Sequence, residues 1–170
     1  MSGILQLGRA LFWLLVIGFL MVLLATFGRL PQVVASHFGA SGAPNGWSSR
    51  SAYATLLVGV GAALPLAVVA LVRAVSRRGP QRLNIPWREY WSRPENGPEA
   101  VRRVRAYMWW LGCIMTASAL GAHLLVVEAN ARVPPQLSTR GIVGLLGGLL
   151  VAIGLWMVGW YRLLRPAARR

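Results

Sequence analysis

The sequence predicts an all-α integral membrane protein, a four-helix bundle with both termini in the cytoplasm. Apolar residues make up 56% of its 170 residues and charged residues only 13%, whereas a soluble domain carries about 25% charged residues. Four apolar blocks without Lys, Arg, Asp or Glu approach the roughly 20 residues that cross a hydrocarbon core. They predict a single membrane domain with spans at about residues 10–27, 53–72, 107–127 and 141–160.

The distribution of arginine predicts the orientation. All 18 basic residues are arginines, and 14 of them fall in the N-terminal lead, the connection at 73–106 and the C-terminal tail. The other side carries Arg29, Arg50, Arg132 and Arg140. Because cytoplasmic segments carry the excess of basic residues, both termini are expected in the cytoplasm. A net charge of +14 bordering membrane spans indicates anionic lipid, and not nucleic acid, as the partner of the cytoplasmic face.

The first two spans each carry one feature that needs interpretation. The N-terminus resembles a secretory signal peptide: Arg9 is followed by an apolar stretch and by a possible cleavage site at residues 33–35. The apolar block is, however, longer than the usual ~7–15 residues of such a segment. We therefore expect a retained helix. Pro65 in the second span removes a backbone donor, so a bend is predicted there. Neighbouring helices can satisfy the carbonyl that this proline frees, so the proline is tolerated in a membrane. A static packing bend is the favoured interpretation, with a functional hinge as the alternative.

The outer loop, residues 28–52, is expected to be a shaped surface feature and not a solvated tether. The run Pro44-Asn45-Gly46 is typical of a turn. Phe38 and Trp47 are aromatic residues suited to the membrane–water interface.

The cytoplasmic connection, residues 73–106, contains prolines that exclude one continuous helix. Trp87, Tyr90 and Trp91 are expected to lie at headgroup depth as interface anchors. Pro98 fits the first turn of a helix, where the pair Glu99 and Arg103 at i,i+4 spacing would reinforce it. The third span is therefore predicted to begin in the cytoplasm as a protruding helix. Ser138 or Thr139 is expected to cap the fourth.

Few polar residues are available for chemistry. The chain has no aspartate and no lysine, and it lacks paired carboxylates, Ser/His/Asp sets, phosphate loops and an HExxH motif, so no catalytic residue, cofactor or metal is expected. His37, His123, Glu128 and Asn130 are the polar set expected to meet near the outer surface. We interpret them as pinning the outer loop to the third span. A zinc site, or an axial His123 ligand to a tetrapyrrole, remains an alternative.

Small residues predict where helices approach closely. Gly144 and Gly148 lie four apart on one face of the fourth span, and Ala117 and Gly121 give the third span a comparable patch. Packing inside the bundle is the favoured interpretation, with packing against another protein as the alternative.

Several residues carry a resemblance to a known family. The run Leu30-Pro31, His37-Phe38, Gly42, Pro44, Gly46-Trp47 and Arg50 resembles the signature of a bacterial membrane family of unknown function, whose domain also forms the N-terminal part of immunity proteins against a sporulation-delaying toxin. Asn84-Ile85-Pro86, Tyr90-Trp91 and Glu128-Ala129-Asn130 are similar as well. The chain departs from the family at two positions. It has Asn45 where the family often has an acidic residue, and it has Arg50 where the family often has a lysine. The resemblance implies a multi-pass protein of the bacterial inner membrane.

The function expected from these features is contact and not catalysis. The chain is interpreted as a non-catalytic accessory subunit of a larger bacterial membrane complex, for example an energy-transducing respiratory or photosynthetic assembly, with other integral membrane proteins as partners. Toxin immunity or envelope sensing is the alternative that the resemblance implies. A transporter is less favoured, because transport needs ionisable groups at mid-membrane.

Overall fold

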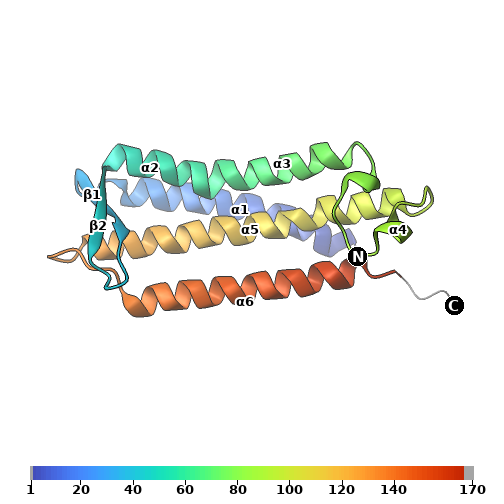
Figure 1. Cartoon of the computed structure of the whole chain (residues 1–170). Helices are drawn as coiled ribbons and strands as arrows, with labels where there is room; N and C mark the ends of the chain where they lie inside the picture. The colour runs from blue at the N-terminus through green and yellow to red at the C-terminus, as the bar shows by residue number, and fades with distance from the viewer. Residues whose placement is uncertain (1, 167–170) are drawn as a thin grey trace.

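The computed structural model describes residues 2–166, and four long helical rods run side by side along its length (Figure 1). Each rod is long and apolar enough to cross a membrane, as the sequence predicts. The rods are α1 (Ser2–Phe27), the continuous series α2 (Arg50–Val58), η1 (Gly59–Ala63) and α3 (Leu64–Ser76), then α5 (Gly97–Asn130) and α6 (Thr139–Leu164).

The helix ends extend beyond the apolar blocks, because local capping residues and not hydrophobicity decide them. Ser138 accepts a hydrogen bond from Gly141 N at 3.2 Å and caps α6, which is the capping role predicted for it. Pro98 stands in the first turn of α5, and Arg103 Nε donates to Glu99 Oε1 at 2.6 Å. The 34 residues of α5 span about 51 Å at 1.5 Å per residue, so this helix does protrude beyond a hydrocarbon core.

Near Pro65, where a bend is predicted, the second rod contains a π-helical turn, η1, which ends two residues before the proline. Pro65 has no N–H to return to Gly61 O four residues earlier. Thr116 Oγ1, on α5, donates to that carbonyl at 2.9 Å instead, and the Thr116 side chain is fully buried. A neighbouring helix thus satisfies the freed carbonyl.

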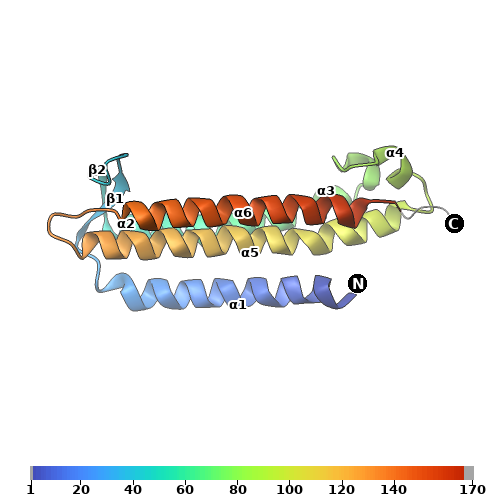
Figure 2. The same cartoon turned by 90° about the horizontal axis from the view of Figure 1, so that it is seen from below.

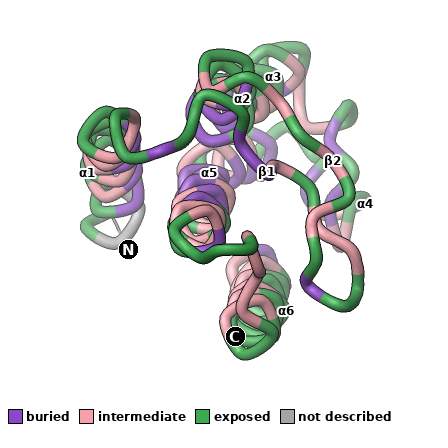
Figure 3. The backbone as a smooth tube through the Cα atoms, turned by 90° about the vertical axis from the view of Figure 1, so that its left-hand side faces the viewer, coloured by how far each residue is buried: buried purple, intermediate pink, exposed green. Residues whose placement is uncertain are grey.

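The rods do not form a closed four-helix bundle. Seen along the rods, α5 lies in the centre, with α1 on one side, α2 and α3 on another, and α6 on a third (Figure 3). The main core joins α1 and α5 to the second rod through Phe12, Phe19, Val69 and Met108. α6 packs chiefly against α5, and Figure 2 shows α1 and α6 on different sides of it.

The described residues are mostly helical, as predicted, but the outer loop adds a small two-stranded antiparallel sheet that the all-α prediction did not include. Strands β1 (Val33–Phe38) and β2 (Pro44–Ser49) pair from Val33 with Ser49 to Phe38 with Pro44. The turn lies at residues 39–43, where Gly42 has φ of 79°, a conformation that favours glycine. The expected turn at residues 44–46 is wrong, because those residues begin the second strand.

The arginine-rich segments lie together at one end of the molecule, and the hairpin lies at the other (Figure 1). At the arginine-rich end, the connection forms the short helices η2 (Pro80–Arg82) and α4 (Arg88–Trp91). These pack on the ends of α5 and α6 through a second small core that includes Leu83, Ile85, Trp91 and Leu164. Arg169 and Arg170 of the predicted tail lie outside the described residues.

Candidate functional site

His123 joins three helices. Its ring is fully buried on α5; Nε2 lies 2.7 Å from Thr26 Oγ1 of α1, and Nδ1 lies 3.0 Å from Tyr53 OH of α2. Thr26 Oγ1 also lies 2.7 Å from Val22 O, which takes its proton. The hydroxyl therefore accepts from His123 Nε2–H, and Tyr53 donates to Nδ1, which assigns the neutral Nε2–H tautomer. We call this set the His123 network. It pins helices to one another, whereas the sequence predicted that His123 would pin the loop.

Asn130, the last residue of α5, holds the hairpin. Its Oδ1 accepts from Ala35 N at 2.9 Å, and its Nδ2 donates to Ala35 O at 3.0 Å. The amide thus pairs with β1 as a neighbouring strand would. At the hairpin tip, Leu137 N donates to Gly42 O at 2.9 Å, and Gln136 Nε2 donates to Ser41 O at 2.8 Å. The hairpin is therefore fixed at both ends to α5 and to the loop that follows it.

His37 and Glu128 do not take part in this pinning. The His37 side chain is exposed, and its Nδ1 lies 3.2 Å from Ser36 Oγ. Glu128 is exposed too and pairs with Arg132 one turn later in the chain. The expectation that His37, His123 and Glu128 meet is therefore corrected. Across residues 2–166, no group of three or more His, Cys, Asp or Glu side chains is placed to hold a metal ion.

The predicted interface aromatics divide into buried and exposed ones. Trp91 is only 3% exposed, and its Nε1 donates to Leu164 O at 2.8 Å. Trp87 packs on Tyr161 at a ring-centroid distance of 4.5 Å, and Tyr90 meets Trp91 edge-on at 4.8 Å. Trp87 and Trp91 therefore bind the α4 segment to α6, and Tyr90 packs against Trp91. The buried Trp91 side chain is a packing residue, whereas the role of Trp87 and Tyr90 as headgroup anchors stays a prediction. In the hairpin, Phe38 is half-buried, and Trp47 is 54% exposed.

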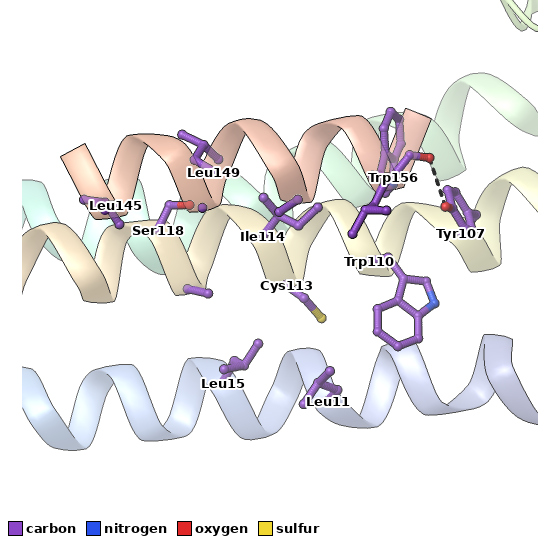
Figure 4. A pocket seen from close by; sticks show the side chains of 15 residues that line it. Leu11, Leu15, Tyr107, Trp110, Cys113, Ile114, Ser118, Leu145, Leu149 and Trp156 are labelled. Carbon is purple, nitrogen blue, oxygen red and sulfur yellow. Dashed lines mark hydrogen bonds between the residues drawn. The ribbon is translucent and has the colours of Figure 1, made fainter. Parts of the chain in front are cut away.

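A long apolar groove lies between α1 and α6, with α5 as its floor (Figure 4). Its volume is about 630 Å³. Leu11 and Leu15 of α1 form one wall, and the floor includes Cys113, which points toward α1 (Figure 4). The stacked rings of Tyr107 and Trp156 stand at its arginine-rich end. The opposite wall belongs to α6 and contains Gly144, Leu145, Gly148, Leu149, Ala152, Leu155 and Trp156.

The four small residues predicted to mediate packing fall into two groups. A Cβ built at Gly121 lies 2.7 Å from Leu145 Cδ1, so this glycine lets α5 and α6 approach within the chain. Gly144 and Gly148 are exposed, and a Cβ built on either meets no other described residue within 4 Å. Ala117 is likewise exposed and lines the groove with them. The favoured expectation that Gly144 and Gly148 pack inside the bundle is wrong.

The sequence analysis missed the partners that make these sites. Tyr53 and Thr26 carried no signal, because they reach His123 from residues 70 and 97 positions away. Arg50 was assigned to the outer-side charges and to the family signature but to no contact, yet its Nη1 donates to Leu30 O at 3.1 Å, and its guanidinium lies 4.9 Å above the Phe27 ring. A donor such as Thr116 could have been predicted, because Pro65 leaves one backbone carbonyl without its helical N–H donor.

Comparison with known proteins finds a family match for one segment of the chain. Residues 13–62 match the family model described as a domain of unknown function (DUF1648). The match runs through α1, the hairpin, α2 and into η1. No curated protein and no solved structure shows significant similarity to the chain. The chain therefore carries a DUF1648 domain that supplies two of the three helices of the His123 network and the hairpin that Asn130 holds.

Proposed function

We propose that this chain is a non-catalytic accessory subunit of a larger membrane complex and that its groove receives one transmembrane helix of another membrane protein. The observation that carries the proposal is the open Gly144/Gly148 face of α6 beside a groove of about 630 Å³. The orientation expected from the arginines, with both termini cytoplasmic in a bacterial inner membrane, belongs to the same proposal.

The character of the groove favours a helix over lipid alone. An apolar surface has no need of a partner in a membrane, because lipid tails are as apolar as leucine. Small residues are different, since they let two helix backbones approach closely and gain packing contacts. From Gly144 to Trp156 the α6 wall runs about 18 Å at 1.5 Å per residue, more than three turns of a partner helix. Ala117 adds a small residue to the floor.

The position of α6 supports the same conclusion. None of the residues in its most apolar window is buried within the chain, whereas 22–28% of the corresponding windows of the other three rods are buried. A helix in the groove would contact both α1 and α6, and it would complete the packing around α5. Contact at this place requires no reactive group.

The polar groups in the spans also favour contact over catalysis. Both ring nitrogens of His123 have hydroxyl partners, and Thr116 and Asn130 are each occupied by backbone groups. These hydrogen bonds explain the three polar side chains as structural links between parts of the fold. An acid, base or nucleophile needs a group poised toward a substrate.

The test is native co-purification at matched expression. Gly144→Leu with Gly148→Leu would fill the groove, and we expect it to release the chain from its partner while leaving the fold intact, because each added side chain starts in open space. Gly147→Leu with Gly154→Leu is the matched control, since these glycines are equally open but do not line the groove. Retention of the partner by the groove variant, or its loss from both variants, would refute the proposal.

Toxin immunity or envelope sensing is a second candidate, and the exposed Trp47 favours it. This side chain is 54% exposed on a hairpin that is held rigidly at both ends, within the segment 13–62 that matches the domain of unknown function. A rigid hairpin with an exposed tryptophan suits recognition of another protein. If the monomeric chain protects cells from a secreted toxin and Trp47→Ala abolishes protection, this candidate replaces the accessory-subunit proposal.

A further inference from the structure

A basic pocket of about 700 Å³ opens at the arginine-rich end, between α1, α3 and α5. Five arginines line it, together with a single carboxylate, that of Glu99. α1 contributes Arg9, α3 contributes Arg73, and α5 contributes Arg102, Arg103 and Arg105. The pocket is separate from the α1–α6 groove and shares no lining residue with it.

The single carboxylate neutralises only part of this charge. Glu99 pairs with Arg102 and with Arg103, and the Arg103 guanidinium also donates to Leu163 O at 2.6 Å. Among the residues that the structure describes, Arg9, Arg73 and Arg105 have no salt bridge. Three guanidinium groups from three different helices therefore line one cavity without an acidic partner.

Arg105 is held in position. Its Nε donates to Ser76 Oγ at 2.6 Å and one Nη to Arg73 O at 3.4 Å, and Ser76 is only 2% exposed. Ser76 Oγ in turn donates to Arg73 O at 3.0 Å. A guanidinium has five N–H donors, so three remain for a ligand. Fixing this side chain in the free protein lowers the entropy cost of binding.

The three unpaired arginines share one depth relative to the membrane. Arg9 is the last charged residue before the apolar stretch of α1, and Arg105 is the last before that of α5. Arg73 directly follows the apolar stretch of the second rod. All three therefore stand at the border between hydrocarbon and headgroups, with the indole of Trp109 in the pocket wall. Tryptophan is suited to that level.

We propose that this pocket binds a phosphate group, that of an anionic phospholipid headgroup. Guanidinium groups match phosphate oxygens by paired hydrogen bonds, and a lipid phosphate is present at this depth in every bilayer. The pocket is thus a defined lipid site, distinct from a diffuse attraction of the whole arginine-rich end for anionic membranes.

The test titrates the purified full-length protein in neutral detergent with phosphatidylglycerol and follows thermal stabilisation and lipid retention in native mass spectra. Arg9→Gln with Arg73→Gln is the pocket variant; both side chains are exposed and bear no described salt bridge. Arg77→Gln with Arg78→Gln is the control, with the same charge change at the same end but outside the pocket. Because charge-assisted guanidinium–phosphate hydrogen bonds are roughly twice as strong as neutral ones, the pocket variant, which loses two guanidinium groups, should lose roughly tenfold or more in apparent affinity. The control should lose less than about threefold.

The second arm identifies the source of the phosphate. Zwitterionic phosphatidylcholine should stabilise the wild type little, and soluble glycerol phosphate at millimolar concentration should not displace phosphatidylglycerol. Displacement by glycerol phosphate, sensitive to the pocket variant, would support the phosphate site but assign it to a soluble ligand. An equal loss in the pocket variant and the control would show diffuse attraction and overturn the proposal. Equal retention of the two lipids by the wild type would overturn it as well.

Discussion

Replacing Tyr53 with phenylalanine tests whether the His123 network holds the helices together. The change removes a hydroxyl that lies 3.0 Å from His123 Nδ1 and keeps the ring, which is 6% exposed. Interhelical hydrogen bonds in membranes contribute about 0.6 kcal/mol on average and about 1.7 at most. Leaving a buried acceptor unpaired costs about 1–3 kcal/mol. Because His123 is fully buried, we expect Tyr53→Phe to lower the free energy of unfolding by about 1–2 kcal/mol.

The measurement is reversible unfolding in mixed detergent micelles, followed by helix content. Tyr161→Phe is the control, because Tyr161 is 56% exposed and the substitution removes a hydroxyl from the surface. This control should change the free energy of unfolding by less than about 0.5 kcal/mol. A double-mutant cycle with His123→Leu isolates the pair, and its coupling energy should be about 1 kcal/mol. Equal effects of the two tyrosine variants together with zero coupling would refute the role assigned to the network.

Two further predictions concern single contacts, and a third concerns the topology. Thr116→Val should destabilise the protein by about 1–2 kcal/mol in the same unfolding assay, because Gly61 O loses the donor that compensates for the proline; an unchanged midpoint would mean that the carbonyl finds another donor. Asn130→Ala should leave the helices intact but speed hydrogen exchange of the hairpin amides, and protection equal to wild type would contradict the pinning role. Single cysteines at Ser41 and Ser92, in a cysteine-free background, should label oppositely from outside intact cells, with only the first reactive; the reverse pattern would invert the topology that the arginines predict.

The open side of the molecule connects the fold with its proposed role. In a soluble protein, a groove of about 630 Å³ with leucines on both walls would be closed by hydrophobic burial. In a membrane that driving force is missing, and helices associate through close packing instead. α6 can therefore remain on one side of α5, held by its contact with that helix and by the α4 segment at its end. The same physics leaves Gly144 and Gly148 free for a helix from outside the chain.

Hydrophobicity and local chemistry in the sequence determined the parts of the fold that depend on neighbouring residues. Lipid requires about 20 apolar residues per span and internally paired backbone groups, so the four rods follow from the four uncharged apolar blocks. The helix starts next to Pro98 and Ser138 were predictable because each is decided within one or two turns of chain. Pro65 predicted a departure from a straight helix, but not the π-helical turn that precedes it. The family signature in the outer loop was recognisable too, although its conformation was not.

Only the tertiary structure decided how these elements meet. Asn130 pairs with a strand residue 95 positions away, and His123 chooses partners 70 and 97 positions away, so no local pattern predicts them. Glycine spacing identified faces suited to close approach. At Gly121 such a face contacts a helix of the same chain, whereas at Gly144 it borders open space. Which face is filled depends on where α5 places α1 and α6 around itself, because in lipid neither arrangement is excluded by hydrophobicity.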